Sequence, residues 1–171
     1  MPLTLNKIGK VIAVSITGLL MMSCSDQEAE SDMTQETNSM EQAVTNETSF
    51  LEENKNKDGV MVTESGLQYK VLLEGSGSRP MATDMVTVHY EGTLIDGTVF
   101  DSSVDRNEPY ESNANQFIPG FNEGLALMKV GSKYKIFIPQ ELGYGIQQRG
   151  QLIKPFSALI FEVEILDILK K

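Results

Sequence analysis

Residues 85–94, "MVTVHYEGTL", decide the class of fold. Apolar or aromatic side chains alternate with polar ones at every second position from Val86 to Glu91. Successive side chains of a strand point to opposite faces, so this alternation predicts a strand with one face in the core. Three further segments show the same pattern: residues 67–73, 132–139 and 158–169. Glycine and proline residues that form turns separate them, which predicts a largely antiparallel sheet.

One segment departs from the strand pattern. Residues 121–131, "FNEGLALMKVG", place Leu125 and Met128 at helical spacing, with Asn122 as the N-cap and Gly131 just past the last turn. Several antiparallel strands with one amphipathic helix predict an α+β domain. We expect a curled antiparallel sheet of about five strands that wraps around one short α-helix, over residues 59–171.

The first residues predict export. Lys7 and Lys10 precede an apolar run over residues 11–22, which is shorter than the roughly 20 residues that a membrane span needs and fits a signal peptide over residues 1–23. A buried amphipathic helix is the weaker alternative, because the run lacks helical periodicity. Cys24 follows "LLMMS", which resembles the lipobox of bacterial lipoproteins and predicts a lipid on Cys24. The alternative is an ordinary cleaved signal peptide with a free thiol.

Two segments connect Cys24 to the domain. Residues 24–48 are acidic, with few large apolar side chains and no aromatic ones, so we expect a disordered tether. Residues 49–58 read as a short helix, because Ser49 and Glu52 have the spacing of a capping box and Gly59 is a stop signal. Ser25 resembles the residue after the lipidated cysteine in outer-membrane lipoproteins. We therefore expect anchoring at a bacterial outer membrane, facing the periplasm.

Composition argues against several classes of function. The chain has one histidine and one cysteine, too few for a usual metal site, so we expect no metal and no cofactor. His89 should point to the opposite face of its strand from Tyr90, which favours a structural role. The net charge of −10 and the lack of a Lys/Arg cluster disfavour nucleic acid as a partner.

Four ordered blocks resemble the FKBP family of peptidyl-prolyl isomerases. They are "VTVHYEGTLIDGTVFDSSVDRNEPY" (86–110), "FIPGFNEGL" (117–125), "IPQELGYG" (138–145) and "ALIFEVEIL" (158–166). The resemblance runs from about residue 65 to residue 169. Residues 49–72 further resemble the macrophage-infectivity-potentiator-like bacterial branch, but without its long dimerising N-terminal domain, so we expect a monomer.

The resemblance implies a set of site residues. Phe121 would be the floor of an aromatic cup, the Ile118 N–H and the Tyr144 hydroxyl would donate hydrogen bonds to the substrate, and Tyr90 would help to hold a carboxylate at the rim. The implied catalytic residues are Asp101, Tyr144, Ile118, Phe121, Tyr90 and Phe100. The implied substrate-binding residues are Arg106, Tyr110, Phe117, Ile153 and Phe161. Taken singly, such aromatic residues are more often core residues, and an Asp–Arg pair is more often an ordinary ion pair on a loop.

Two features depart from the family pattern. Phe121 stands where tryptophan is common. The loop over residues 145–157 lacks paired prolines and carries Arg149 where many relatives have histidine.

The partners that the resemblance implies are proline-containing unfolded or exported polypeptides, with macrolides as inhibitors. The alternative function is a chaperone or binding module that holds proline-containing segments with little turnover.

Overall fold

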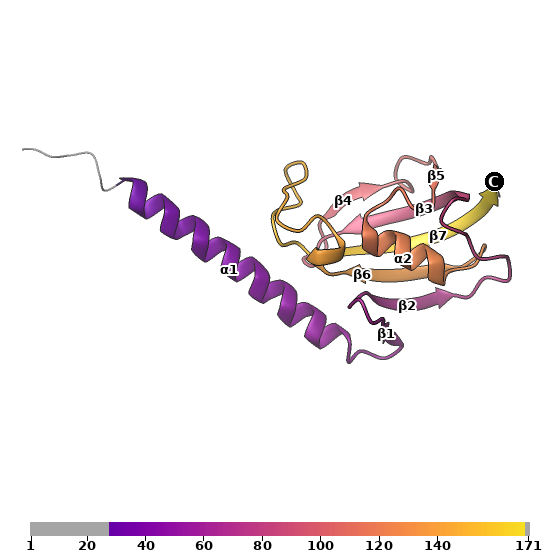
Figure 1. The fold of residues 1–171 in the computed structure, drawn as a ribbon, viewed down its shortest axis with the longest axis horizontal. Coiled ribbons are helices and arrows are strands. Elements are labelled where there is room, and N and C mark those ends of the chain that lie inside the picture. Colours follow the sequence, from indigo (N-terminus) through magenta and orange to yellow (C-terminus); the bar gives the residue numbers. More distant parts are fainter. Residues whose placement is uncertain (1–27, 170–171) are drawn as a thin grey trace, which may run out of the picture.

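The structure is a computed structural model that describes the backbone of residues 28–169 and the side chains from residue 41 onward. The predicted signal peptide and Cys24 lie outside the described residues. One long helix, α1 (Glu28–Asn54), leads into a sheet that carries a short helix, α2, on one face (Figure 1). The strands are β1 (Val60–Val62), β2 (Gln68–Leu73), β3 (Met85–Thr93), β4 (Val99–Ser102), β5 (Tyr110–Asn113), β6 (Lys133–Ile138) and β7 (Leu159–Leu169).

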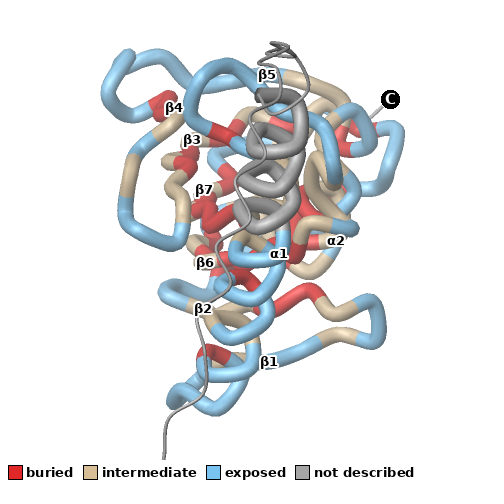
Figure 2. Tube along the Cα trace, turned by 90° about the vertical axis from the view of Figure 1, so that its left-hand side faces the viewer, coloured by how far each residue is buried: buried red, intermediate tan, exposed pale blue. Residues whose placement is uncertain are grey.

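All strand pairs of the sheet are antiparallel, in the order β1-β2-β6-β7-β3-β4, with β5 also paired to β3. The predicted α+β class is confirmed, but the sheet has seven strands within residues 28–169 instead of about five. Burial alternates along β3, with Val86, Val88 and Tyr90 facing the core. Buried residues concentrate along β3, β7 and β6 (Figure 2).

Helix α2 (Pro119–Leu127) lies in the predicted region but is shifted toward the N-terminus. Ile118 is the N-cap and Pro119 begins the first turn, where proline suits a helix start. The predicted N-cap Asn122 instead bonds through its side chain to the N–H and C=O of Phe117, at 3.0 and 3.1 Å. The helix ends before Gly131 because Met128 is already extended. Phe121 and Leu125 face the core.

Helix α1 contradicts the predicted disordered tether and the separate short helix. Residues 28–48, expected to be disordered, are helical, and Ser49 and Glu52 lie inside the helix and not at its start. Low apolar content limits core formation but not helix formation, and no glycine or proline interrupts residues 28–58. Acidic residues near its N-terminus also suit the positive end of the helix dipole.

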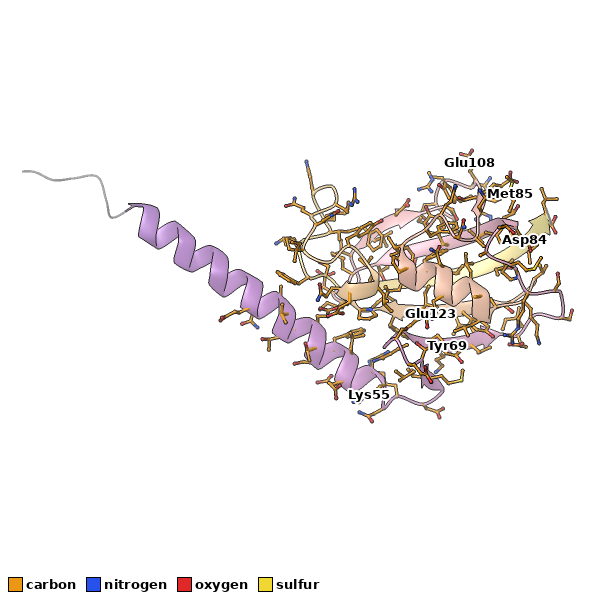
Figure 3. All side chains as sticks on the ribbon, viewed as in Figure 1. Lys55, Tyr69, Asp84, Met85, Glu108 and Glu123 are labelled. Atoms are coloured by element: carbon orange, nitrogen blue, oxygen red, sulfur yellow. The ribbon has the colours of Figure 1, made fainter. Side chains whose placement is uncertain are left out.

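The C-terminal half of α1 docks on the domain through one stripe of side chains. The least exposed residues are Ala43, Glu47, Phe50, Leu51 and Asn54, at the spacing of one helix face. The Phe50 ring lies 6.1 Å from that of Phe137 on β6. Asn54 donates to Gln68 on β2 at 2.9 Å, and Gln68 donates back to the Leu51 carbonyl at 2.8 Å. Figure 3 labels Lys55, where the chain leaves α1 beside the domain.

Glu47 is a buried carboxylate within this contact. Its side chain accepts the Gln140 N–H at 2.5 Å, at the start of the short 3₁₀ helix η1 (Gln140–Leu142). Burial, with a smaller contribution from nearby Glu141, raises the pKa of Glu47 to about 7 against the opposing effect of the hydrogen bond from Gln140. The docked carboxyl therefore binds its proton more tightly than a free one, so docking weakens as the pH rises from about 4.5 through 7.

Glu47→Gln is expected to remove this pH dependence. Glutamine keeps an acceptor for the Gln140 N–H but cannot ionise, so docking should be tighter than in the wild type at pH 8, by about 1–3 kcal/mol, and similar at pH 5. Amide hydrogen exchange over residues 44–54 measures the opening free energy of this contact. Glu53→Gln, on the exposed side of α1, is the control and should keep the wild-type pH dependence. An unchanged pH dependence in Glu47→Gln would contradict the role of this carboxyl.

Candidate functional site

A cavity of about 690 Å³ opens between α2, the β3–β5 side of the sheet and the loop over residues 145–157, called the flap below. The flap is the loop between η1 and β7 (Figure 1). All eleven residues proposed from the sequence line this one cavity: Tyr90, Phe100, Asp101, Arg106, Tyr110, Phe117, Ile118, Phe121, Tyr144, Ile153 and Phe161. Residues far apart in the chain therefore form one concave surface.

Three further residues line the cavity: Gln116, Arg149 and Gly150. Sequence reasoning singled out Arg149 only as a departure in the flap and missed the other two. Gln116 lies in an irregular turn and Gly150 in the flap, where no periodicity indicates which way a residue faces. His89 does not line this cavity; its Nδ1 lies 3.0 Å from the Ser103 hydroxyl, which fits the predicted structural role.

Aromatic rings form the floor and walls. Phe121, on the first turns of α2, is 2% exposed, and its ring stacks on Phe117 with centroids 4.6 Å apart. Edge-on contacts join it to Tyr90 at 6.1 Å and to Phe161 at 5.1 Å. Edge-to-face rings at such separations attract one another, and here they fix one another's orientation. The result is a rigid apolar cup.

Gly92 allows this packing on β3. A Cβ atom there would lie 2.6 Å from the Phe100 ring and 2.8 Å from the Phe161 ring, closer than real side-chain contacts. The absence of a side chain lets the two rings meet over the strand, with centroids 5.4 Å apart. The glycine in "HYEGT" is therefore a packing requirement of the cup.

A carboxylate is fixed at the edge of the cup. Asp101 on β4 accepts the Tyr90 hydroxyl at 2.5 Å through one oxygen and forms an ion pair with Arg106 through the other. Arg106 also donates to the Tyr90 hydroxyl at 3.3 Å. Burial disfavours ionisation of Asp101, but the hydrogen bonds from Tyr90 and Arg106 outweigh it and hold its pKa below the usual value. Asp101 is therefore a fixed anion at neutral pH.

Tyr90 is held neutral beside it. Burial, together with the hydrogen bond to Asp101, raises the pKa of Tyr90 to about 12. The loop that carries Arg106 is tied to β3 by Ser103, whose N–H donates to the Tyr90 carbonyl at 2.9 Å and whose hydroxyl accepts the Tyr90 N–H at 2.8 Å. The three groups therefore form a rigid electrostatic unit with no group ready to exchange a proton near pH 7.

Two donors face the cavity without partners in the described chain. Among residues 41–169, whose side chains the structure describes, neither the Ile118 N–H nor the Tyr144 hydroxyl has a hydrogen-bond partner. Tyr144 follows η1, and Gly145, with a positive φ of 59°, turns the chain so that its N–H returns to the Gln140 carbonyl at 2.9 Å. These donors could bind a carbonyl oxygen that enters the cup.

Tyr134, an aromatic residue of the strand pattern, packs outside the cavity. Tyr134 on β6 stacks on Tyr69, labelled beside β2 in Figure 3, with centroids 5.9 Å apart, and donates to Glu74 at 2.9 Å outside the cavity. Among the described side chains of residues 41–169, no group of three His, Cys, Asp or Glu could hold a metal ion. No helix in the described part of the chain combines the length and apolar composition needed to cross a membrane.

Two family models match the chain. The model described as FKBP-type peptidyl-prolyl cis-trans isomerase matches residues 77–166, which contain all fourteen residues that line the cavity. A model of the domain amino-terminal to this isomerase matches residues 15–71, so the chain carries sequence of that domain over these residues. The expected absence of the longer dimerising segment stays a prediction.

Curated relatives agree with these models. The chain is 59% identical over 120 residues to the FKBP-type 22 kDa peptidyl-prolyl cis-trans isomerase of Escherichia coli, which covers 70% of this chain and 58% of that protein. It is 46% identical over 121 residues to the outer membrane protein MIP of Legionella longbeachae, covering 71% and 52%. The chain thus spans little more than half the length of these relatives.

Solved structures show the same fold. FkpA from Escherichia coli superposes with a TM-score of 0.71 at 37% identity, covering 84% of this chain and 73% of that one. A peptidyl-prolyl cis-trans isomerase from Pseudomonas syringae gives a TM-score of 0.71 at 34% identity, covering 77% and 96%. Both similarities extend well beyond the residues that line the cavity.

Proposed function

Because this chain belongs to the FKBP-type peptidyl-prolyl cis-trans isomerase family, we propose that it accelerates rotation about the peptide bond before proline in exported polypeptides. The observation that carries the proposal is the cavity itself, an aromatic cup with a fixed carboxylate and two unpartnered donors at its edge. The roles of the eleven residues are part of this proposal.

The cup suits the physics of the reaction. Rotation about a peptide bond has a barrier of about 18–20 kcal/mol because amide resonance is lost, and uncatalysed exchange before proline takes tens of seconds or more. Resonance separates charge in the planar amide, so an apolar cavity stabilises the planar form less than water does. The twisted form has lost that charge separation, so the apolar cavity lowers its free energy relative to that of the planar form. A thousandfold acceleration needs only about 4 kcal/mol of such differential stabilisation.

The polar groups act on the twisted amide. The Ile118 N–H and the Tyr144 hydroxyl can donate to the substrate carbonyl once it has rotated out of plane. Asp101 can polarise the rotating bond or accept a hydrogen bond from the substrate backbone. It does so as a permanent anion, because Arg106 and Tyr90 keep it ionised and fixed. No bond is made or broken, so the reaction needs neither a nucleophile nor a general acid.

A refolding assay tests the proposal on a polypeptide substrate. A small protein whose slow refolding phase is limited by proline isomerisation should refold faster with catalytic amounts of the full chain in detergent. The acceleration should be lost when a macrolide inhibitor, which we propose occupies the same cup, is added. A slow phase that is unchanged by a folded chain would contradict the proposal.

A second candidate is a binding module with little turnover. The flap exposes Ile146 (73%) and Leu152 (45%) next to the cavity, and such apolar residues could hold unfolded segments without catalysis. A chain that suppresses aggregation of an unfolded client at equimolar amounts, but leaves the proline-limited phase unchanged, would favour this candidate over the isomerase.

We also propose that a lipid on Cys24 anchors the chain to an outer membrane, facing the periplasm. Support comes from the lipobox-like sequence before Cys24 and from the printed name of the Legionella relative, an outer membrane protein. The part of helix α1 before its docked stripe, which begins at Ala43, would separate the domain from the bilayer. In Cys24→Ser, fatty-acid labelling of the chain should be lost, and the chain should no longer be found in the membrane fraction.

The monomeric state stays a prediction, and sedimentation of the purified chain checks it.

A further inference from the structure

Arg149 is the unpaired charge of the cavity. The other charged residues that line it, Asp101 and Arg106, form an ion pair with each other. Among the side chains that the structure describes, those of residues 41–169, no carboxylate lies within ion-pairing distance of Arg149. The cavity therefore carries a net positive charge, although the chain as a whole has a net charge of −10. This local excess points to a ligand group of negative charge.

The Arg149 side chain is held at the cavity by neutral contacts. Its guanidinium lies 5.1 Å from the ring centroid of Tyr144, one of the proposed donors, and it donates to the Gln147 side chain at 3.2 Å. Its backbone forms a bridge with Ile153, with the Arg149 N–H donating at 2.9 Å. Gly150, with a positive φ of 59°, makes the turn between them. Stacking on a tyrosine ring leaves guanidinium N–H groups free for a further acceptor.

We infer that Arg149 makes the cavity selective for polypeptides with an acidic residue next to the proline. This inference rests on the proposed isomerase function and names the substrate class for that same site. The planar guanidinium matches a carboxylate with two parallel hydrogen bonds, and its position beside Tyr144 places it near residues that flank a proline in the cup. The same charge disfavours a lysine at the same place.

Matched peptides test the inference. We expect kcat/KM of the full chain in detergent to be about 3- to 10-fold higher for Ala-Glu-Pro-Phe than for Ala-Gln-Pro-Phe, or for Ala-Leu-Pro-Glu than for Ala-Leu-Pro-Gln. The lysine analogue should be slowest. High salt should reduce the Glu/Gln ratio, because the guanidinium is exposed to solvent. A change of packing alone would not produce this dependence on charge and salt.

Two variants assign the preference to one side chain. Arg149→Gln should bring the Glu/Gln ratio close to 1. Lys154→Gln removes the same charge from the flap but outside the cavity, and it should keep the wild-type ratio. Two results would overturn the inference, provided that a Leu-Pro peptide is still isomerised. One is a wild type with no Glu/Gln preference in either peptide series, and the other is an Arg149→Gln variant that keeps that preference. Lack of isomerisation of every peptide, the Leu-Pro peptide included, would instead remove the proposed function and this inference with it.

Discussion

Replacing Asp101 with asparagine is expected to lower kcat/KM for prolyl isomerisation by about 10- to 100-fold while the chain stays folded. Asparagine has nearly the same shape and still accepts the Tyr90 hydroxyl, but it carries no charge to act on the twisted amide. A loss of this size corresponds to about 1.4–2.7 kcal/mol of transition-state stabilisation. The half-exposed ion pair with Arg106 contributes little to folding, so the melting temperature should change only slightly.

The control for this variant lies on the loop that follows β4. Asp105 is exposed and does not line the cavity, so Asp105→Asn should keep the wild-type kcat/KM. Circular dichroism and thermal melting verify that both variants are folded. A folded Asp101→Asn variant with wild-type turnover of a Leu-Pro peptide would remove the carboxylate from the mechanism.

The same unit predicts the pH profile. Hydrogen bonds from Tyr90 and Arg106 outweigh the effect of burial and keep the pKa of Asp101 below its ordinary value, while burial raises that of Tyr90 to about 12. Neither group changes its protonation between pH 5 and 9, so kcat/KM for a peptide without ionisable side chains should be flat over this range. The contribution of Asp101 to stability is present above its unfolded pKa and is lost as the pH falls through its lower folded value. A bell-shaped kcat/KM profile centred near pH 7 would indicate acid–base catalysis instead.

Phe121→Ala is expected to cause the largest loss of stability, about 3–5 kcal/mol in the free energy of unfolding. The ring is 2% exposed and contacts Tyr90, Phe117 and Phe161, so its removal leaves a cavity at the centre of the cup. Denaturant unfolding measures the change. A loss below about 1 kcal/mol would mean that the neighbouring rings can collapse into the space and that the cup is not rigid.

Phe121→Leu separates the function of the ring from its contribution to stability. Leucine keeps much of the buried volume and should cost about 1–2 kcal/mol of stability, but it removes the aromatic floor, so kcat/KM should fall about 5- to 10-fold. Phe137→Leu is the matched control, because Phe137 is also buried but lies on β6 outside the cavity. It should lose similar stability without the loss of turnover. Equal loss of turnover in both variants would mean that the floor ring has no specific role.

The long strands and the cavity residues could be predicted because both leave signals in the sequence. The alternation from Val86 to Tyr90 follows directly from strand geometry, and the burial along β3 confirms it. The short strands β1, β4 and β5 have three or four residues, too few for a period to show. The eleven predicted residues of the cavity come from the four blocks and, for Ile153, from the flap, so only an ordered family resemblance could bring them together.

The errors at the N-terminal side have a different cause. Helix α1 was expected to be mostly disordered because its residues cannot build a core alone, but a helix also forms where one face docks on an existing domain. Glu47, which looks like one more solvated acidic residue in the sequence, lies on the docked face of α1, is buried there and accepts the Gln140 N–H. No local pattern indicates which carboxylate of an acidic helix will be buried.

Isomerisation itself can be observed by NMR exchange between the cis and trans signals of a Leu-Pro peptide, with the full chain in detergent at a small fraction of the peptide concentration. Without a catalyst, exchange takes about 10–100 s at 25 °C and gives no exchange cross-peaks on the one-second scale. We predict strong cross-peaks with the wild type and much weaker ones with Asp101→Asn. Peptide signals that shift or broaden on binding, without any exchange between the cis and trans forms, would show that the cup binds proline segments but does not catalyse their rotation.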